Sequence, residues 1–192
     1  MTTLARRILV AAALSMALPG LQAAACPAHP TAAKAPMPAL GLAITTPEPV
    51  ARALFEAGLT AYWAGDAATA LHAFRAAQAA DPTCAMCHWG EALALGPRPQ
   101  APMPSTHVRP AWEAILRAEA LAARAGPLER ELIAALRHRY GVSPMVLRDA
   151  LDNAWATAIA RVAESAGEAD LLRLLLGEAQ AILRAHGPQA AG

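Results

Sequence analysis

The stretch GLTAYWAGDAATALHAFRAAQAADP, residues 58–82, carries the strongest fold signal in this chain of 192 residues. Apolar residues recur at helical spacing on both sides of Gly65-Asp66, a pair that typically ends one helix and begins the next. The second run spans residues 67–80 and stops at Asp81-Pro82, because proline cannot continue a helix. Its apolar face consists of Ala70, Phe74 and Ala77. The stretch therefore predicts two short antiparallel helices joined by a tight turn.

This helix pair resembles the tetratricopeptide repeat, a unit of about 34 residues built from two antiparallel helices. The small, large and proline positions of the repeat signature are occupied in register by Gly58, Ala70, Phe74, Ala77 and Pro82. Small residues let two helices approach closely, and phenylalanine fills the space above them. The resemblance implies an all-α fold, an α-solenoid-like stack of antiparallel helix pairs.

The rest of the chain after residue 46 also shows helical periodicity, with no convincing strand. Thr46 is suited to cap the first helix, with Pro47 as its first residue, and Ser143 and Pro144 fill the same roles for the sixth helix. Four prolines between residues 97 and 104 exclude a regular helix there. We expect about seven helices, over residues 47–64, 67–80, 86–95, 112–125, 128–140, 144–166 and 168–185.

Both ends of the chain differ from this helical domain, which we place at residues 47–186. Arg6 and Arg7 precede an apolar run at residues 8–18, which is typical of a signal peptide over residues 1–25 and too short to span a membrane. Cleavage there predicts export, to the periplasm, and leaves open a lipid anchor at Cys26. Residues 26–46 are rich in Pro and Ala and predict a linker, and residues 187–192 predict a disordered tail.

A longer part of the chain resembles a family of exported bacterial tetratricopeptide proteins. The matching segments are FEAGL (55–59), YW (62–63), DPTCAM (81–86) and WGEALALGP (89–97). The resemblance implies a scaffold that binds a protein or peptide in a groove lined by the first helix of each repeat. The corresponding residues are Arg52, Phe55, Leu59, Tyr62 and Trp63, followed on the next helix by Met86, Trp89 and Leu93. An alternative is that the aromatic residues among them are buried within the domain.

Composition argues for a binding role and against an enzyme. The formal net charge is +1, and the arginines alternate with acidic residues along the helices, so nothing indicates a nucleic-acid partner. The chain has no glycine-rich phosphate loop and no nucleophile motif, and its acidic residues lack the paired spacing of a catalytic or metal site. We therefore expect a non-enzymatic protein without a cofactor.

One motif supports a different function. Cys84-x-x-Cys87-His88 is the pattern by which two thiols attach haem covalently and the histidine binds its iron. Met103 or His107 would supply the second iron ligand, which makes a small c-type haem protein, an electron carrier, the alternative function. Three other interpretations stay open: a reversible disulfide, a Cu(I) site that also uses Met86 or Met103, and a buried thiol pair without chemistry.

Overall fold

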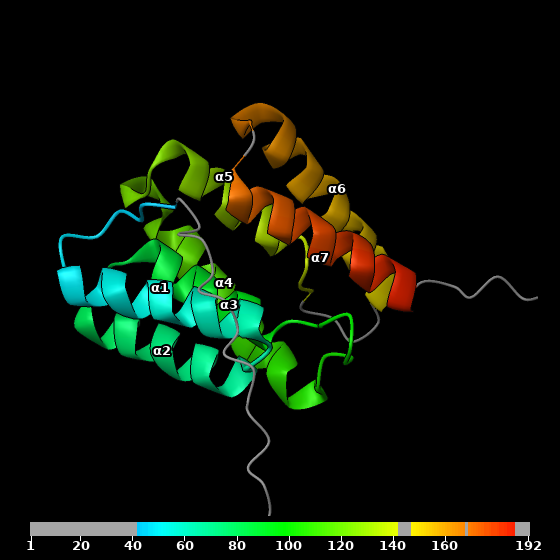
Figure 1. Cartoon of the computed structure of the whole chain (residues 1–192), viewed down its shortest axis with the longest axis horizontal. Coiled ribbons are helices and arrows are strands. Elements are labelled where there is room, and N and C mark those ends of the chain that lie inside the picture. Colours follow the sequence, from blue (N-terminus) through cyan, green and yellow to red (C-terminus); the bar gives the residue numbers. More distant parts are fainter. Residues whose placement is uncertain (1–41, 142–146, 168, 187–192) are drawn as a thin grey trace, which may run out of the picture. The chain divides into compact units, whose positions relative to one another are not determined.

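A computed structural model of the chain describes residues 42–141, 147–167 and 169–186 (Figure 1). These residues form seven α-helices and one 3₁₀ turn, η1, without a β-strand, so the predicted all-α fold is confirmed. The helices are α1 (Pro49–Ala64), α2 (Ala67–Ala80), α3 (Ala85–Leu95), α4 (Ser105–Leu121), α5 (Pro127–Arg137), α6 (Arg148–Ala166) and α7 (Asp170–His186), and η1 covers Ala122–Arg124. None of the helices in these ranges is both long and apolar enough to cross a membrane.

Each helix packs mainly against its neighbours in the chain. Helices α1 and α2 lie side by side, as do α6 and α7 (Figure 1). Two further contacts skip one helix, between α1 and α3 and between α3 and α5. Buried apolar side chains from all seven helices join in a single core, including Phe55, Phe74, Trp89, Ile115, Leu132, Trp155 and Leu175.

The turn between α1 and α2 follows the sequence signals closely. Gly65 has a φ of 87°, in the left-handed region that favours glycine, and it ends α1. Asp66 then caps α2, because its carboxylate accepts a hydrogen bond from the Thr69 backbone N–H at 3.0 Å. The conformation of Gly65 and the cap at Asp66, both within the turn itself, are thus sufficient to explain the hairpin.

Phe74 of α2 lies against two glycines. A Cβ atom added at Gly58 of α1 would lie 2.6 Å from the Phe74 ring, and one added at Gly90 of α3 would approach the same ring just as closely. The ring therefore fills the space where three helices meet. Gly58 and Phe74, a small and a large position of the repeat signature, are therefore in direct contact.

The start of α1 differs from the expectation. The helix begins at Pro49 with Glu48 as its N-cap, whereas the sequence predicted a cap at Thr46 and a start at Pro47. The Thr46 hydroxyl instead donates to the Asp81 carboxylate at 2.6 Å and accepts from the Glu48 N–H at 3.1 Å. This pairing with Asp81 joins segments 35 residues apart, so local cap preferences could not reveal it.

Residues 42–46, the end of the predicted linker, form a strap across the helical domain. Ile44 is buried in the core. Thr45 donates its N–H and its hydroxyl to the two carboxylate oxygens of Glu129, at 2.7 and 2.5 Å. The domain therefore begins before residue 47. Residues 1–41, with the predicted signal peptide, Cys26 and most of the linker, lie outside the described residues, as do Ser143, Pro144 and the tail at 187–192.

Candidate functional site

Most of the predicted groove residues are core residues. Phe55, Leu59, Tyr62 and Trp89 are at most 2% exposed, and Met86 and Leu93 are equally buried. Two of them form hydrogen bonds with helices from later in the chain. The Trp89 indole donates to the Leu132 carbonyl of α5, and the Tyr62 hydroxyl donates to the Glu178 carboxylate of α7. These side chains cannot line an open groove, and that part of the expectation is wrong.

The other two predicted groove residues remain near the surface. Arg52 is exposed, and its guanidinium donates to the Thr46 carbonyl at 3.0 Å, so it holds the strap in place. Trp63 is partly exposed at the end of α1, and its ring packs edge-on against Tyr62 with 5.0 Å between ring centroids. Of the predicted aromatic residues, Trp63 is the one whose ring is accessible from outside.

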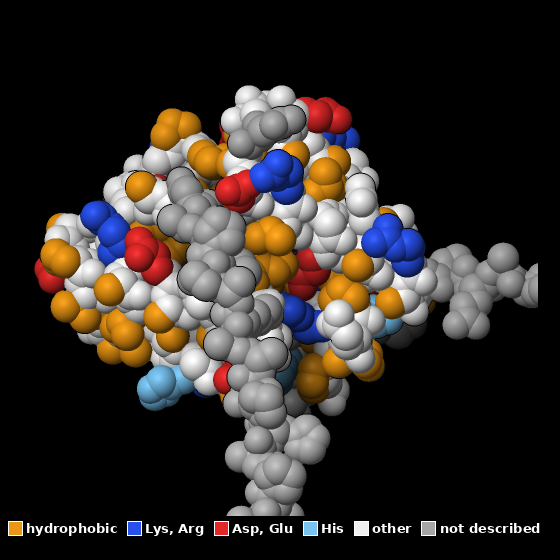
Figure 2. Space-filling view, in the orientation of Figure 1, with side chains coloured by type: hydrophobic (Ala, Val, Ile, Leu, Met, Phe, Trp, Pro, Cys, Tyr) orange, Lys and Arg blue, Asp and Glu red, His pale blue; other side chains and the backbone are white. Residues whose placement is uncertain are grey.

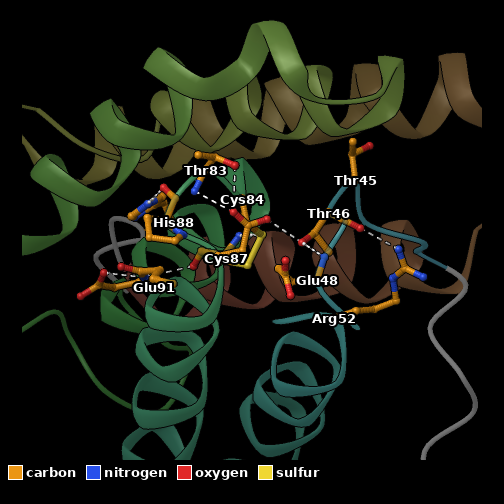
Figure 3. The surroundings of a disulfide bond; sticks show 12 residues. Thr45, Thr46, Glu48, Arg52, Thr83, Cys84, Cys87, His88 and Glu91 are labelled. Atoms are coloured by element: carbon orange, nitrogen blue, oxygen red, sulfur yellow. Dashed lines mark hydrogen bonds between the residues drawn. A yellow bond between two sulfur atoms is a disulfide. The ribbon is translucent and has the colours of Figure 1, made fainter. Parts of the chain in front are cut away.

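Cys84 and Cys87 form a disulfide at the beginning of α3 (Figure 3). Cys84 is the N-cap, and its sulfur accepts a hydrogen bond from the Cys87 N–H at 3.1 Å. Both residues are completely buried. Haem attachment needs two free thiols beside an open space, so this geometry favours the disulfide over the haem and copper interpretations.

Met103 lies beyond the other end of the same helix. The cysteines are at the N-terminal end of α3, which is about 16 Å long, and Met103 is in the loop that follows its C-terminal end. It packs, partly buried, against the core. No group of three His, Cys, Asp or Glu side chains in the described part of the chain is arranged to hold a metal ion. The structure therefore places Met103 away from Cys84, Cys87 and His88.

The polar groups around the disulfide are held by one another (Figure 3). The His88 ring nitrogen Nε2 lies 3.3 Å from the Pro82 carbonyl. Burial lowers the pKa of His88, against the opposing effects of Pro82 and Glu91. Burial alone would raise the pKa of Asp81, but hydrogen bonds from Thr46 and Thr83 outweigh it and the net pKa is lowered. These contacts fix the α2–α3 turn around a disulfide whose two cysteines are buried.

A buried cluster of charged residues joins the first helix to the last, and sequence reasoning missed it. The Tyr62 hydroxyl donates to Glu178 Oε1 at 2.5 Å. The guanidinium groups of Arg98 and Arg139 lie 3.6 and 3.9 Å from the same oxygen. Arg98 also lies over the Tyr62 ring, 3.9 Å from its centroid. Burial, reinforced by the charge of Glu178, raises the pKa of Tyr62 well above its usual range, so Tyr62 stays a neutral donor.

The cluster continues through Arg139 toward α6. Arg139 is fully buried, donates to the Pro97 carbonyl at 2.5 Å and lies over the Trp155 ring. Burial alone would lower the pKa of Arg139, but the neighbouring Tyr62 and Glu178 raise it, so the residue is charged. Asp152 is paired with Arg148 at 2.9 Å. Three arginines thus face two carboxylates.

One signal in the sequence pointed to this cluster. Glu178 falls on the apolar stripe of α7, at helical spacing with Leu171, Leu175 and Ile182. An acidic residue in that position must find partners inside the protein, because an unpaired buried charge is costly. Its partners lie far away in the sequence, and no periodicity identifies them.

A pocket of about 340 Å³ opens beside the cluster. Its lining includes Trp63 of α1, Arg98 of the α3–α4 loop, and Arg173, Leu174, Gly177 and Glu178 of α7. Figure 2 shows basic and acidic side chains close together among hydrophobic ones on the face that carries α1 and α7. The site therefore combines an apolar wall with charges of both signs.

Comparison with known protein families, with curated proteins and with solved structures finds no match for this chain.

Proposed function

We propose that this protein is an exported, tetratricopeptide-like scaffold, not an enzyme, that binds a short segment of a protein or peptide partner. The observation that carries the proposal is the pocket at the end of α1, where the partly exposed Trp63 stands beside Arg98 and α7. The pocket is within the usual size range of ligand sites, roughly 300–1,000 Å³, and accommodates one or two side chains. Tryptophan and arginine are also the residues that most often dominate binding energy at protein interfaces.

Two observations support the scaffold and its compartment. The α1–α3 and α3–α5 contacts beside the consecutive helix pairs are what stacked repeats would produce, and the meeting of Gly58, Gly90 and Phe74 fits the repeat signature. A buried disulfide persists in an oxidising compartment, which agrees with export to the periplasm.

A peptide selection tests the proposal. The oxidised, folded protein is used to select binders from a random peptide library, and the affinities of the selected peptides are then measured. We expect Trp63→Ala to weaken binding at least tenfold. Trp112→Ala is the matched control, because Trp112 is also partly exposed but lies on α4 under the guanidinium of Arg137. Failure to select any peptide, or equal losses in the two variants, would refute the proposal.

A further inference from the structure

The charged cluster beside the pocket contains three arginines and two carboxylates, so it has a net charge of +1. Glu178 is the carboxylate that both Arg98 and Arg139 approach, and both face the same oxygen, Oε1. That oxygen already accepts the Tyr62 hydroxyl. The other carboxylate of the cluster, Asp152, is engaged by Arg148 through two nitrogens at 2.9 Å. A single carboxylate cannot neutralise two guanidinium groups, so one positive charge is left in a largely desolvated place.

The geometry assigns this surplus to Arg98. Arg139 is fully enclosed and lies outside the pocket lining, whereas the Arg98 side chain is 21% exposed and forms part of the pocket wall. Arg98 Nη2 donates to the Tyr62 carbonyl at 3.2 Å. Nη1 is buried 3.6 Å from Glu178 Oε1 without a hydrogen-bond partner, and Nε and Nη1 of Arg139 are likewise buried and unpartnered. A charged acceptor in the pocket, placed against the exposed part of the Arg98 side chain, would offset this positive charge.

Glu178 shows what else the ligand must offer. Its second carboxylate oxygen, Oε2, is also buried without a hydrogen-bond partner, and Glu178 lines the same pocket. A simple anion would meet Arg98 but would leave this acceptor unpaired and would be repelled by it. A peptide carries backbone N–H donors next to its carboxylate, so it can serve Arg98 and Glu178 together.

We propose that the partner segment places a carboxylate against Arg98, with a backbone N–H toward Glu178 and an apolar side chain against Trp63 and Leu174. This inference rests on the proposed peptide-binding function and names the chemistry that its site recognises. Arg173 stands at the pocket rim, 66% exposed and paired with Asp170, and adds a positive group that a carboxylate passes on entry. Either an acidic side chain or the C-terminus of a partner can supply the carboxylate.

Four synthetic peptides distinguish these sources. Acetyl-Ala-Leu-Glu-Leu-Ala-amide has a side-chain carboxylate, and acetyl-Ala-Leu-Leu with a free C-terminus has a terminal one. Their neutral counterparts carry Gln in place of Glu, or a C-terminal amide. Titrations of the full mature protein are followed by tryptophan fluorescence and by nuclear magnetic resonance. We expect at least one acid to bind tenfold or more tightly than its neutral counterpart, with an affinity that falls as salt rises.

Variants locate the effect at the pocket. Arg98→Gln should abolish the preference for the acid, and Arg173→Gln should reduce it two- to fivefold. Arg75→Gln is the matched control, since Arg75 is an exposed arginine paired with Glu91 on the α2–α3 surface, and it should change nothing. If Arg98→Gln does not fold, the wild-type preference and the exposed Arg173→Gln variant decide the question.

The outcomes separate the two proposals. Equal binding of acids and neutral peptides at Trp63 would overturn the carboxylate inference and leave the peptide-binding function intact. Binding of inorganic phosphate in an Arg98-dependent manner, with no binding of any peptide, would identify an anion site and overturn both.

Discussion

At the scale of single residues, Phe74 is the side chain around which the first three helices are spaced. Its ring occupies the room that a Cβ at Gly58 or Gly90 would need. We expect Gly58→Ala and Gly90→Ala to lower the free energy of unfolding by about 1–3 kcal/mol each, the usual cost of overpacking. Urea denaturation followed by circular dichroism measures this.

Gly177→Ala is the control for these two substitutions. Gly177 lies inside α7, and a Cβ there meets no neighbour within 4 Å. Replacing a helical glycine at an open position should stabilise the protein by up to about 1 kcal/mol. If all three alanine variants shift stability in the same direction, the close packing of Phe74 is not what constrains Gly58 and Gly90.

His88 makes the stability depend on pH near neutrality. Its pKa is lowered in the folded state, so below its usual value of about 6.5 the unfolded chain binds more protons than the folded protein. The stability associated with neutral His88 is therefore present above about pH 6.5 and is lost as the pH falls toward the folded-state pKa. The charged groups around it are Glu91, Arg117 and Asp81.

His88→Gln should flatten this part of the pH profile. We expect the melting temperature of the wild type to fall between pH 7 and 5 more steeply than that of the variant. His72→Gln is the comparison, since His72 lies on the surface of α2 and not beside the disulfide. A wild-type slope that persists in His88→Gln would assign the effect to another group.

At the scale of elements, sequence reasoning succeeded where both ends of a helix carry local signals. The bounds of α2 agree with the expected residues 67–80, because Asp66 caps one end and Asp81-Pro82 closes the other. The start of α1 was misplaced because Thr46-Pro47 and Glu48-Pro49 are both plausible starts. Only the bond between Thr46 and Asp81, which depends on the fold, decides between them.

The disulfide is the strongest constraint on the turn that leads into α3. It closes a loop of four residues, for which the loss of chain entropy in the unfolded state predicts a stabilisation of about 2 kcal/mol. We expect reductant to lower the stability of the protein that keeps the disulfide by that amount and to leave Cys84→Ala/Cys87→Ala unaffected. Both proteins carry Cys26→Ser, so that no third thiol exchanges with the pair. Urea denaturation with and without reductant gives the two values.

The rate of reduction is a separate test of the burial of both sulfurs. Because Cys84 and Cys87 are inaccessible, a reductant reaches them only when the protein opens. Reduction in native buffer should therefore be slow and should accelerate in low urea. Immediate reduction of the folded protein would show that the disulfide is exposed and would restore the redox interpretation of the motif.

At the scale of the whole molecule, the predicted open groove is absent from the residues that the structure describes, because helices from later in the chain cover it. The repeat pattern carries no information about those helices. The pattern describes contacts between consecutive helices, and it led us to expect Phe55, Tyr62 and Trp89 in an open groove, whereas all three are buried. It could not show that α5 and α7 provide partners for these residues, because Tyr62 and Glu178 are 116 residues apart. What remains accessible is the edge of the predicted groove, at Trp63 and Arg98.

The contact between Tyr62 and Glu178 should therefore stabilise the fold as a link between its first and last helices. A double-mutant cycle with Tyr62→Phe and Glu178→Gln measures the coupling. We expect an interaction energy of about 1–3 kcal/mol, because the hydrogen bond is buried and its acceptor also faces Arg98 and Arg139. Glu178→Gln alone should cost more than Tyr62→Phe, since it leaves two buried guanidinium groups without their shared carboxylate.

The exposed pair of Arg109 and Glu113 on α4 provides the reference for this cycle. Their nitrogen and oxygen lie 3.0 Å apart, closer than either arginine lies to Glu178, but the side chains are 88% and 59% exposed. Exposed pairs of this spacing contribute about 0.3–0.5 kcal/mol. A coupling between Tyr62 and Glu178 no larger than that of the reference would mean that α7 is held by its apolar side chains alone. The charged cluster would then be free to rearrange around a ligand without loss of the fold.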